Sequence, residues 1–296
     1  MDFKNANELL KLCGDNQIPI SEVMKRRECV LGENEESVVV SRMKRALEIM
    51  RESAKAALQR PRKSMGGWIG GEAKKLHVHY QEGKDICGNV MSRGIAYAMG
   101  VLEVNASMGL IVAAPTAGSA GIVPGTLLAL QDEYQLPDEK VIEALFNAGA
   151  VGYLAMRNAT VAGAVGGCQA EVGVASSMAA SAAVELMGGA PEQCLDAAST
   201  VLMNMLGLVC DPVAGLVEYP CQNRNAAGVA NALIAAEMSL SGINCRIPFD
   251  EMLNTMYAVG KRLPAEYRET AMGGCAATPT ACQGCSGVCG NIAEKV

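Results

Sequence analysis

The stretch AEVGVASSMAASAAVELMGG, residues 170–189, decides the fold. Alanine dominates it, and alanine is the strongest helix former. The glycine pair at its end is a typical C-terminal helix cap. Because most of its side chains are small, neighbouring helices can approach it closely. The stretch therefore predicts a helix within a closely packed helical protein.

Helical patterns continue on both sides of this stretch. The clearest covers 36–60, where apolar residues recur every three or four positions until Pro61 ends the helix. Two short helices are expected within 1–32, with Ser21 as the N-cap of the second. The remaining predicted helices cover about 84–102, 126–134, 138–157, Pro191 to near Gly207, 223–241 and 250–262.

The chain shows no strand alternation apart from short apolar runs such as 110–114, and no repeat or linker divides it. We therefore predict an all-α fold with one helical domain, residues 1–274, in which glycine- and proline-rich interhelical loops carry the chemistry. A cysteine-rich C-terminal tail, residues 275–296, follows this domain.

Composition and charge argue against some classes of binding partner. A net charge of −6 gives no basic surface for a nucleic acid. The longest uncharged run, 104–131, contains Pro115 and Pro124 and does not resemble a membrane span. No secretory signal is visible at the N-terminus, so a cytoplasmic protein with reduced thiols is expected.

Three cysteines lie in loops that glycine or proline keeps out of a helix. Cys168 lies in GAVGGCQAEVG (163–173), while Cys210 and Cys221 bracket CDPVAGLVEYPC. Thiolates select iron–sulfur clusters or zinc, and free loop N–H groups can bond cluster sulfides. Arg224, just after Cys221 near a helix start, would favour an anionic group there. On spacing alone the signal for a metal site is weak, and buried cysteines acting as small apolar residues explain the trio better.

Five blocks carry a family resemblance. The chain resembles the α subunit of bacterial iron–sulfur-dependent L-serine dehydratase (L-serine ammonia-lyase) over nearly its whole length, and the cysteine loops are the most specific part. The blocks are GGWIGGEAKK (66–75), EVNASMGLIVAAPTAGSAGIVPG (103–125), GGCQAEVGVASSMAA (166–180), CDPVAGLVEYPCQNRNAAG (210–228) and YRETAMGG (267–274).

The resemblance implies a function and a cofactor. Cys168, Cys210 and Cys221 would ligate a [4Fe–4S] cluster whose fourth iron meets the small amino-acid substrate. That iron would assist loss of the serine hydroxyl, giving pyruvate and ammonia without pyridoxal phosphate. The resemblance also implies a β subunit as partner, which would supply a histidine base. Within this chain, only His77 and His79 could serve, and their spacing does not make them an obvious pair.

Substrate contacts are expected in the PTAGSAG loop (115–121), whose hydroxyls and small residues suit an anion. Thr116 and Ser119 are the candidates there, with Asn105 nearby. Lys74 and Arg224 are further candidates as cations. A tight helix connection and ordinary solvated side chains are the structural alternatives for these residues.

The tail carries Cys275, Cys282, Cys285 and Cys289 in a C-x6-C-x2-C-x3-C pattern, which is more cysteine than the family's usual ending. Three interpretations stay open. The tail could bind its own zinc or cluster, cap the open iron until substrate displaces it, or carry thiols that merely oxidise.

Other functions also remain open. The same cluster chemistry would serve an L-cysteine desulfidase, because the sequence does not separate a hydroxyl from a thiol leaving group. A non-catalytic electron-transfer or metal-binding module, or a scaffold subunit, are the alternatives from other classes. An electron carrier normally has four protein ligands on its cluster, which favours an enzyme.

Overall fold

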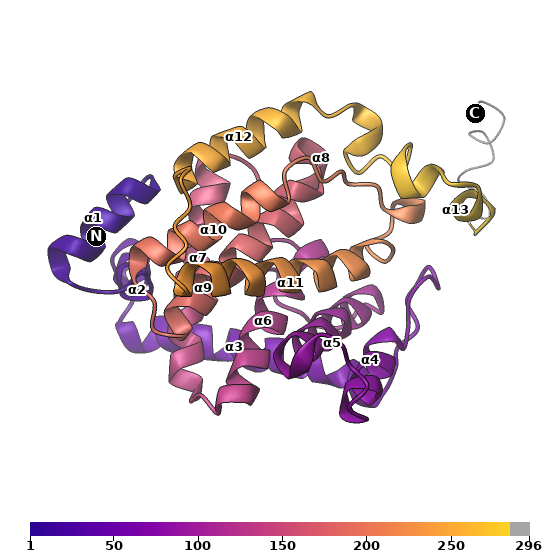
Figure 1. Cartoon of the computed structure of the whole chain (residues 1–296), viewed down its shortest axis with the longest axis horizontal. Helices are drawn as coiled ribbons and strands as arrows, with labels where there is room; N and C mark the ends of the chain where they lie inside the picture. The colour runs from indigo at the N-terminus through magenta and orange to yellow at the C-terminus, as the bar shows by residue number, and fades with distance from the viewer. Residues whose placement is uncertain (285–296) are drawn as a thin grey trace.

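In the computed structural model, which describes residues 1–284, helix α9 (Val174–Leu186) runs through the middle of a helical bundle (Figure 1). Every residue from Val174 to Val184 is buried. Helices α6 (Ile122–Tyr134), α7 (Asp138–Asn158), α10 (Pro191–Asn204) and α11 (Cys221–Leu240) pack around it. The small side chains of α9 leave room for neighbours on all sides, as the sequence predicted.

The other helices extend this core. Helix α5 packs on α3, α4, α6 and α11, α2 packs on α7, and α12 packs on α10. Their bounds are α1 (Ala6–Asn16), α2 (Ile20–Leu31), α3 (Glu36–Gln59), α4 (Glu72–Gln81), α5 (Gly88–Ala106), α8 (Gly163–Gly166), α12 (Phe249–Arg262) and α13 (Pro279–Gly284). Short helical turns are η1 (Ala117–Ser119), η2 (Gln169–Gly173), η3 (Val213–Gly215), η4 (Ala265–Tyr267) and η5 (Gly274–Ala277).

Glycine allows the closest of these helix contacts. A Cβ atom added to Gly125 of α6 would lie 2.8 Å from the carbonyl oxygen of Gly94 on α5, a distance that real Cβ atoms do not adopt. The two backbones can therefore touch only because position 125 has no side chain. This crossing fixes the start of α6, and with it the loop before α6 that carries Thr116.

The all-α prediction is confirmed. Within residues 1–284 the only β pairing is an isolated parallel bridge between Cys210 and Arg268, and 110–114 is irregular chain. Every helix in this part of the chain is too short or too polar to serve as a membrane span. The predicted boundary between residues 274 and 275 stays a prediction.

Most predicted helices are present, one prediction is wrong, and three helices were not predicted. Ser21 is not an N-cap, because α2 begins at Ile20, and the N–H of the buried Ser21 donates to Glu185 of α9. The unpredicted helices are α4, α8 and α13. Some predicted helices have shifted ends: α5 covers 88–106 rather than 84–102, and α6 starts at Ile122 rather than 126.

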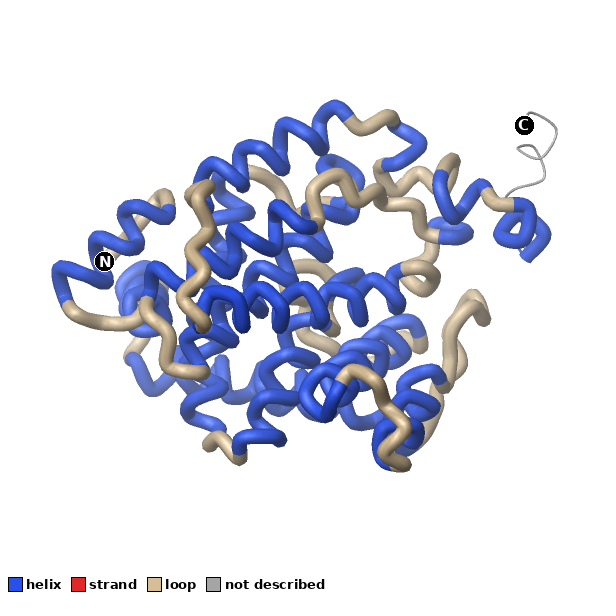
Figure 2. Tube along the Cα trace, viewed as in Figure 1, coloured by secondary structure: helices blue, strands red, loops and turns tan. Residues whose placement is uncertain are grey.

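Loops that are distant in sequence meet at one end of the bundle. Figure 2 shows the connection between α10 and α11 passing beside the chain that follows α12. Hydrogen bonds join these segments: the N–H of Cys210 donates to Tyr267 at 2.9 Å, and the N–H of Gln169 donates to Leu208 at 3.0 Å. This end of the bundle holds all three loop cysteines.

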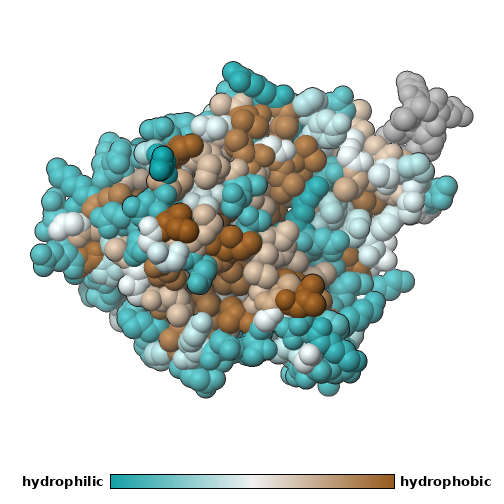
Figure 3. Space-filling model, in the orientation of Figure 1, coloured by the Kyte–Doolittle hydropathy of each residue, from teal (hydrophilic) through white to brown (hydrophobic). Residues whose placement is uncertain are grey.

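A different face carries an apolar groove. Figure 3 shows apolar residues gathered over α11. Ile234 of α11 and Tyr134 of α6, respectively 47% and 53% exposed, line a groove of about 520 Å³ there. None of its lining residues belongs to the cysteine loops.

Candidate active site

The three loop cysteines occupy different local structures. Cys168 directly precedes η2, Cys210 lies in the extended chain after α10, and Cys221 is the first residue of α11. Cys168 and Cys210 are each 3% exposed. Both polar backbone groups of Cys210 are hydrogen-bonded: its N–H donates to the carbonyl of Tyr267, and its carbonyl accepts from the N–H of Glu269 at 2.7 Å. The fold thus holds loops together that the sequence places far apart.

The three thiols share one electrostatic environment. A hydrogen bond with Cys210 lowers the pKa of Cys168 against the effect of burial, and the Arg224 guanidinium lowers it further. The same hydrogen bond and burial raise the pKa of Cys210. Burial and then the negative charge of Cys168 raise the pKa of Cys221 to about 12. Of the three thiols, Cys168 is therefore the one whose thiolate form its surroundings favour.

Arg224 lies inside this group and not at its rim. Its guanidinium donates to the carbonyl of Val209 at 2.8 Å and forms an ion pair of 2.6 Å with Asp211. Burial lowers the pKa of Arg224, but the charges of Cys168 and Asp211 outweigh this effect and raise it. Its position in the first turn of α11 adds the helix dipole to its own positive charge.

Glu171 reaches the cysteines from η2. Its Oε2 lies 3.6 Å from the Sγ of Cys210, and its Oε1 accepts a 2.8 Å hydrogen bond from the Thr116 hydroxyl. Ligand atoms of Glu171, Cys210 and Glu269 all lie within 4.8 Å of one another, which makes them a possible metal-binding group. Burial raises the pKa of Glu171, and the neighbouring Glu269 raises it further.

Gly163 of α8 lies in close contact with this pair. A Cβ atom at position 163 would lie 2.5 Å from the Oε2 of Glu171 and 2.9 Å from the Sγ of Cys210, closer than real Cβ atoms approach other atoms. Any side chain at position 163 would therefore displace Glu171 or Cys210. The thiols of Cys168 and Cys210 are hydrogen-bonded and Cys221 is close enough to interact with the charge of Cys168, so this donor set fits a metal centre.

The PTAGSAG loop, whose residues were predicted to contact substrate, lies against the same group. The Thr116 and Ser119 hydroxyl oxygens are 3.1 Å apart, and Thr116 contacts Glu171. Asn225 of α11 ties the loop to the cysteines, because its amide donates to Gly118 and to Cys221 at 2.8 and 2.9 Å. Asn105 is half-buried, and its amide donates to the carbonyl of Ala117 at 3.4 Å. The structure thus brings Thr116, Ser119 and Asn105 near Cys221.

A buried carboxylate joins the glycine-rich 64–71 loop to the cysteine loop. Glu218 lies between Cys210 and Cys221 in sequence and is 2% exposed. It accepts hydrogen bonds from the Ser64 hydroxyl at 2.6 Å and from the N–H groups of Gly66 and Trp68 at 2.6 and 3.1 Å. The 64–68 segment is thereby held against the loop that carries the cysteines.

The start of the tail lies on the cysteine loop as well. The N–H of Cys275 donates to Asp211 at 2.6 Å, and Cys275 and Cys282 pack with Trp68, Val213 and Ala281 in a small apolar cluster. Cys285 and Cys289 lie outside the described residues. The tail thus begins beside Asp211, and none of its three interpretations is decided.

The remaining candidates lie on α4. The Lys74 ammonium donates to the carbonyl of Gln59 at 3.4 Å, so it is directed towards α3 and not towards the cysteines. His77 packs its ring edge against Tyr80, and burial together with the Arg93 charge lowers its pKa. His79 is exposed in the last turn of the helix. The contacts of these three side chains therefore do not link them to the cysteine loops.

The sequence analysis missed the acidic residues of the site, namely Glu171, Asp211, Glu218 and Glu269. A signal was present, because each lies within a quoted block and Asp211 is the immediate neighbour of Cys210. Asp211 and Glu218 become buried, and a buried carboxylate needs partners, which here are site residues.

Comparisons with known proteins agree with this geometry. The family model described as serine dehydratase alpha chain matches residues 15–276. The probable L-serine dehydratase alpha chain of Bacillus subtilis is 48% identical, over 94% of this chain and 92% of the relative. The L-serine dehydratase alpha chain of Peptoniphilus asaccharolyticus is 41% identical, over 94% of this chain and 95% of the relative.

Longer relatives match as well. The L-serine dehydratase TdcG of Escherichia coli is 38% identical over 93% of this chain, but the match spans only 62% of that relative. On the extent of the family match and the identity to full-length alpha chains, this chain belongs to the serine dehydratase alpha chain family.

Proposed function

We propose that this chain catalyses the deamination of L-serine to pyruvate and ammonia, as the alpha chain of an L-serine dehydratase. The names of its relatives support this activity. The observation that carries it is the meeting of Cys168, Cys210 and Cys221 beside the Thr116–Glu171 pair. Thiols that would ligate a metal and hydroxyls that would contact a small substrate then lie at the same end of the bundle.

Cys168, Cys210 and Cys221 would hold a [4Fe–4S] cluster. The lowered pKa of Cys168, the burial of Cys168 and Cys210 and the proximity of Cys221 to the Cys168 charge support this assignment. When bound, a cluster with three protein thiolates supplies a Lewis-acidic iron that makes hydroxide a feasible leaving group, so pyridoxal phosphate is not required.

The protein's own groups orient the amino acid. Thr116, Ser119 and Asn105 lie on one side of the cysteines, and their hydroxyl and amide donors would bind the serine carboxylate. Arg224 adds positive charge close to Cys168, which favours an anionic substrate in this part of the site. Glu171 holds the Thr116 hydroxyl and so fixes the direction of that donor.

A partner chain would supply the base for the α-proton. His77 and His79 are directed elsewhere on α4, and the E. coli relative has more than a third of its length outside the match. We assign the base to a histidine of a β subunit, which would correspond to that additional part. The alpha chain alone would then be weakly active or inactive.

The experiment combines metal analysis with turnover. Protein purified without oxygen is assayed for iron, sulfide and visible absorbance, and then for pyruvate from L-serine with and without a β chain. Cys168→Ala, Cys210→Ala and Cys221→Ala should each lose the cluster, while Cys245→Ala, outside these loops, should keep it. Wild-type protein without iron would overturn the cluster assignment. Faster pyruvate release from L-cysteine than from L-serine would indicate the desulfidase. A cluster whose electron paramagnetic resonance spectrum does not change when L-serine is added would indicate electron transfer.

A further inference from the structure

A second pocket lies away from the cysteines, between α2, α3 and α7. It has a volume of about 390 Å³, within the range of roughly 300–1,000 Å³ that is usual for small-molecule sites. Met24, Val39, Met43 and Phe146 form its apolar part. The pocket shares no residue with the candidate active site, so ligand binding in it does not depend on the proposed function.

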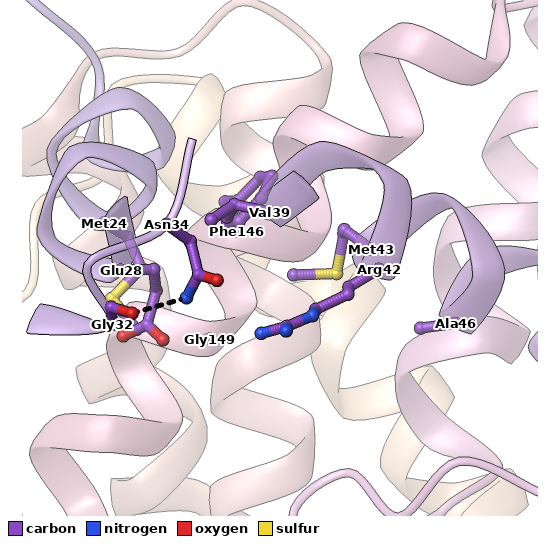
Figure 4. Close-up of a pocket in the computed structure, with 10 residues that line it drawn as sticks. All are labelled: Met24, Glu28, Gly32, Asn34, Val39, Arg42, Met43, Ala46, Phe146 and Gly149. Carbon is purple, nitrogen blue, oxygen red and sulfur yellow. Dashed lines mark hydrogen bonds between the residues drawn. The ribbon is translucent and has the colours of Figure 1, made fainter. Parts of the chain in front are cut away.

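Two opposite charges face each other across this pocket. Figure 4 shows Arg42 of α3 and Glu28 of α2 pointing towards one another from opposite sides. Glu28 uses its Oε1 in a 3.0 Å bond with Arg27. Among residues 1–284, the Arg42 guanidinium has no hydrogen-bond or ion-pair partner. The pocket therefore offers an unused cation and a partly used carboxylate above an apolar floor.

The floor is kept open by a glycine that the packing does not require. A Cβ atom on Gly149, in the middle of α7, would meet only the Cε of Met24, at 3.9 Å. At Gly152, one turn later, a Cβ atom would lie 3.0 Å from Met178, so close packing explains that glycine. Glycine within a helix is destabilising relative to alanine. At position 149 the only effect of the missing side chain is therefore to leave the floor of the pocket empty.

We propose that this pocket binds a free α-amino acid with an apolar side chain. Its carboxylate would pair with Arg42, its ammonium with the free oxygen of Glu28, and its side chain would lie on Met24, Met43 and Phe146. A carboxylate pairs bidentately with a guanidinium, and the apolar contacts favour side chains such as those of methionine and leucine.

The test is calorimetric titration of the whole protein with L-methionine and L-leucine. Hexanoate and hexylamine, which carry only one of the two charges, serve as reference ligands. We expect saturable binding of the amino acids in the millimolar range or tighter, and weaker binding of both reference ligands. Absence of saturable heat with the amino acids, or equally tight binding of hexanoate, would overturn the proposal.

Variants test whether the heat of amino-acid binding comes from this pocket. Arg42→Ala should weaken binding by roughly tenfold or more, because it removes a charged hydrogen bond. Lys44→Ala, an exposed change on α3 outside the pocket, should leave it unchanged. Gly149→Leu should abolish binding by filling the floor. If that variant does not fold, Gly149→Ala should raise the melting temperature and still weaken binding. Unaltered affinity in Arg42→Ala would contradict the assignment.

Discussion

The carboxylate of Glu218 accepts a 2.6 Å hydrogen bond from the backbone N–H of Gly66, which lies 152 residues earlier in the chain. The Ser64 hydroxyl and the Trp68 N–H donate to the same carboxylate. Glu218 is 2% exposed and Ser64 is buried, so the bond between these two side chains has little access to water. The three bonds to Glu218 hold the 64–68 segment over the cysteine loop, together with a 3.0 Å bond from the Met65 N–H to the carbonyl of Ala106.

Glu218→Ala should destabilise the protein strongly, because it leaves the buried Ser64 hydroxyl and two backbone N–H groups without their acceptor. We expect a loss of about 3 kcal/mol or more in the free energy of unfolding, measured by urea denaturation. Glu218→Gln should cost less, since the amide oxygen can still accept. Glu52→Ala, at an exposed position of α3, is the matched control and should change stability by less than about 0.5 kcal/mol. Similar midpoints for Glu218→Ala and Glu52→Ala would contradict the role of Glu218.

Gly163→Ala should disturb the site without unfolding the chain. The new Cβ atom would lie within 3 Å of both Glu171 and Cys210, so at least one of these two side chains must shift. We expect reduced iron per chain and reduced serine turnover, with an unchanged helical circular-dichroism spectrum. Gly14→Ala on α1 has no neighbour within 4 Å and should keep full iron while gaining about 0.5–1 kcal/mol of stability. Full iron content in Gly163→Ala would show that iron binding does not depend on the positions of Glu171 and Cys210.

The sequence predicted elements whose signals are local. Helix α3 ends at Gln59, close to the predicted end before Pro61, because an apolar repeat and a proline define it without help from the rest of the fold. Helix α7 likewise begins at Asp138 as predicted. The resemblance located the cysteines through motifs that are also local.

Elements fixed by distant partners were missed. Helix α4 buries only Ala73, so it has no apolar repeat, and its N-cap Gly71 has no capping side chain. A carboxylate from α5 replaces the cap, since Glu103 accepts from the N–H of Ala73 at 2.9 Å. Glu171 and Glu218 were missed for the same reason: their partners Thr116 and Ser64 lie far away in sequence. Single-sequence patterns do not contain such pairs.

Glu185→Gln should stabilise the protein at neutral pH. Burial raises the pKa of Glu185 above 4.5 against the hydrogen bonds from Ser21 and Asn147, and Glu143 adds to the rise. Between pH 4.5 and the higher pKa of the native state, the unfolded chain loses the proton that the native state keeps. The free energy of unfolding therefore falls as the pH rises through this range. Glutamine can accept both hydrogen bonds through its amide oxygen, and it removes this dependence.

The measurement is the melting temperature between about pH 5 and 8. The wild-type value should fall more steeply with pH than that of Glu185→Gln, and the variant should be the more stable at the upper end. Glu237→Gln, at an exposed position of α11, should follow the wild type. A steeper fall in the Glu185→Gln variant would show that the native state holds this carboxyl in its ionised form.

Thr116→Val tests whether the Thr116 hydroxyl acts on substrate. The change keeps the shape of the side chain but removes the donor to Glu171 and the contact with Ser119. We expect kcat/KM for L-serine to fall by roughly tenfold or more, which corresponds to one lost hydrogen bond to a charged group. Thr126→Val on α6 is the matched control, because Thr126 has the same side chain and is buried, but its hydroxyl has no partner within the described residues. That variant should keep full activity and equal or higher stability, since no hydrogen bond is lost. Equal kcat/KM in both variants would remove Thr116 from the substrate site and leave it a structural support of Glu171.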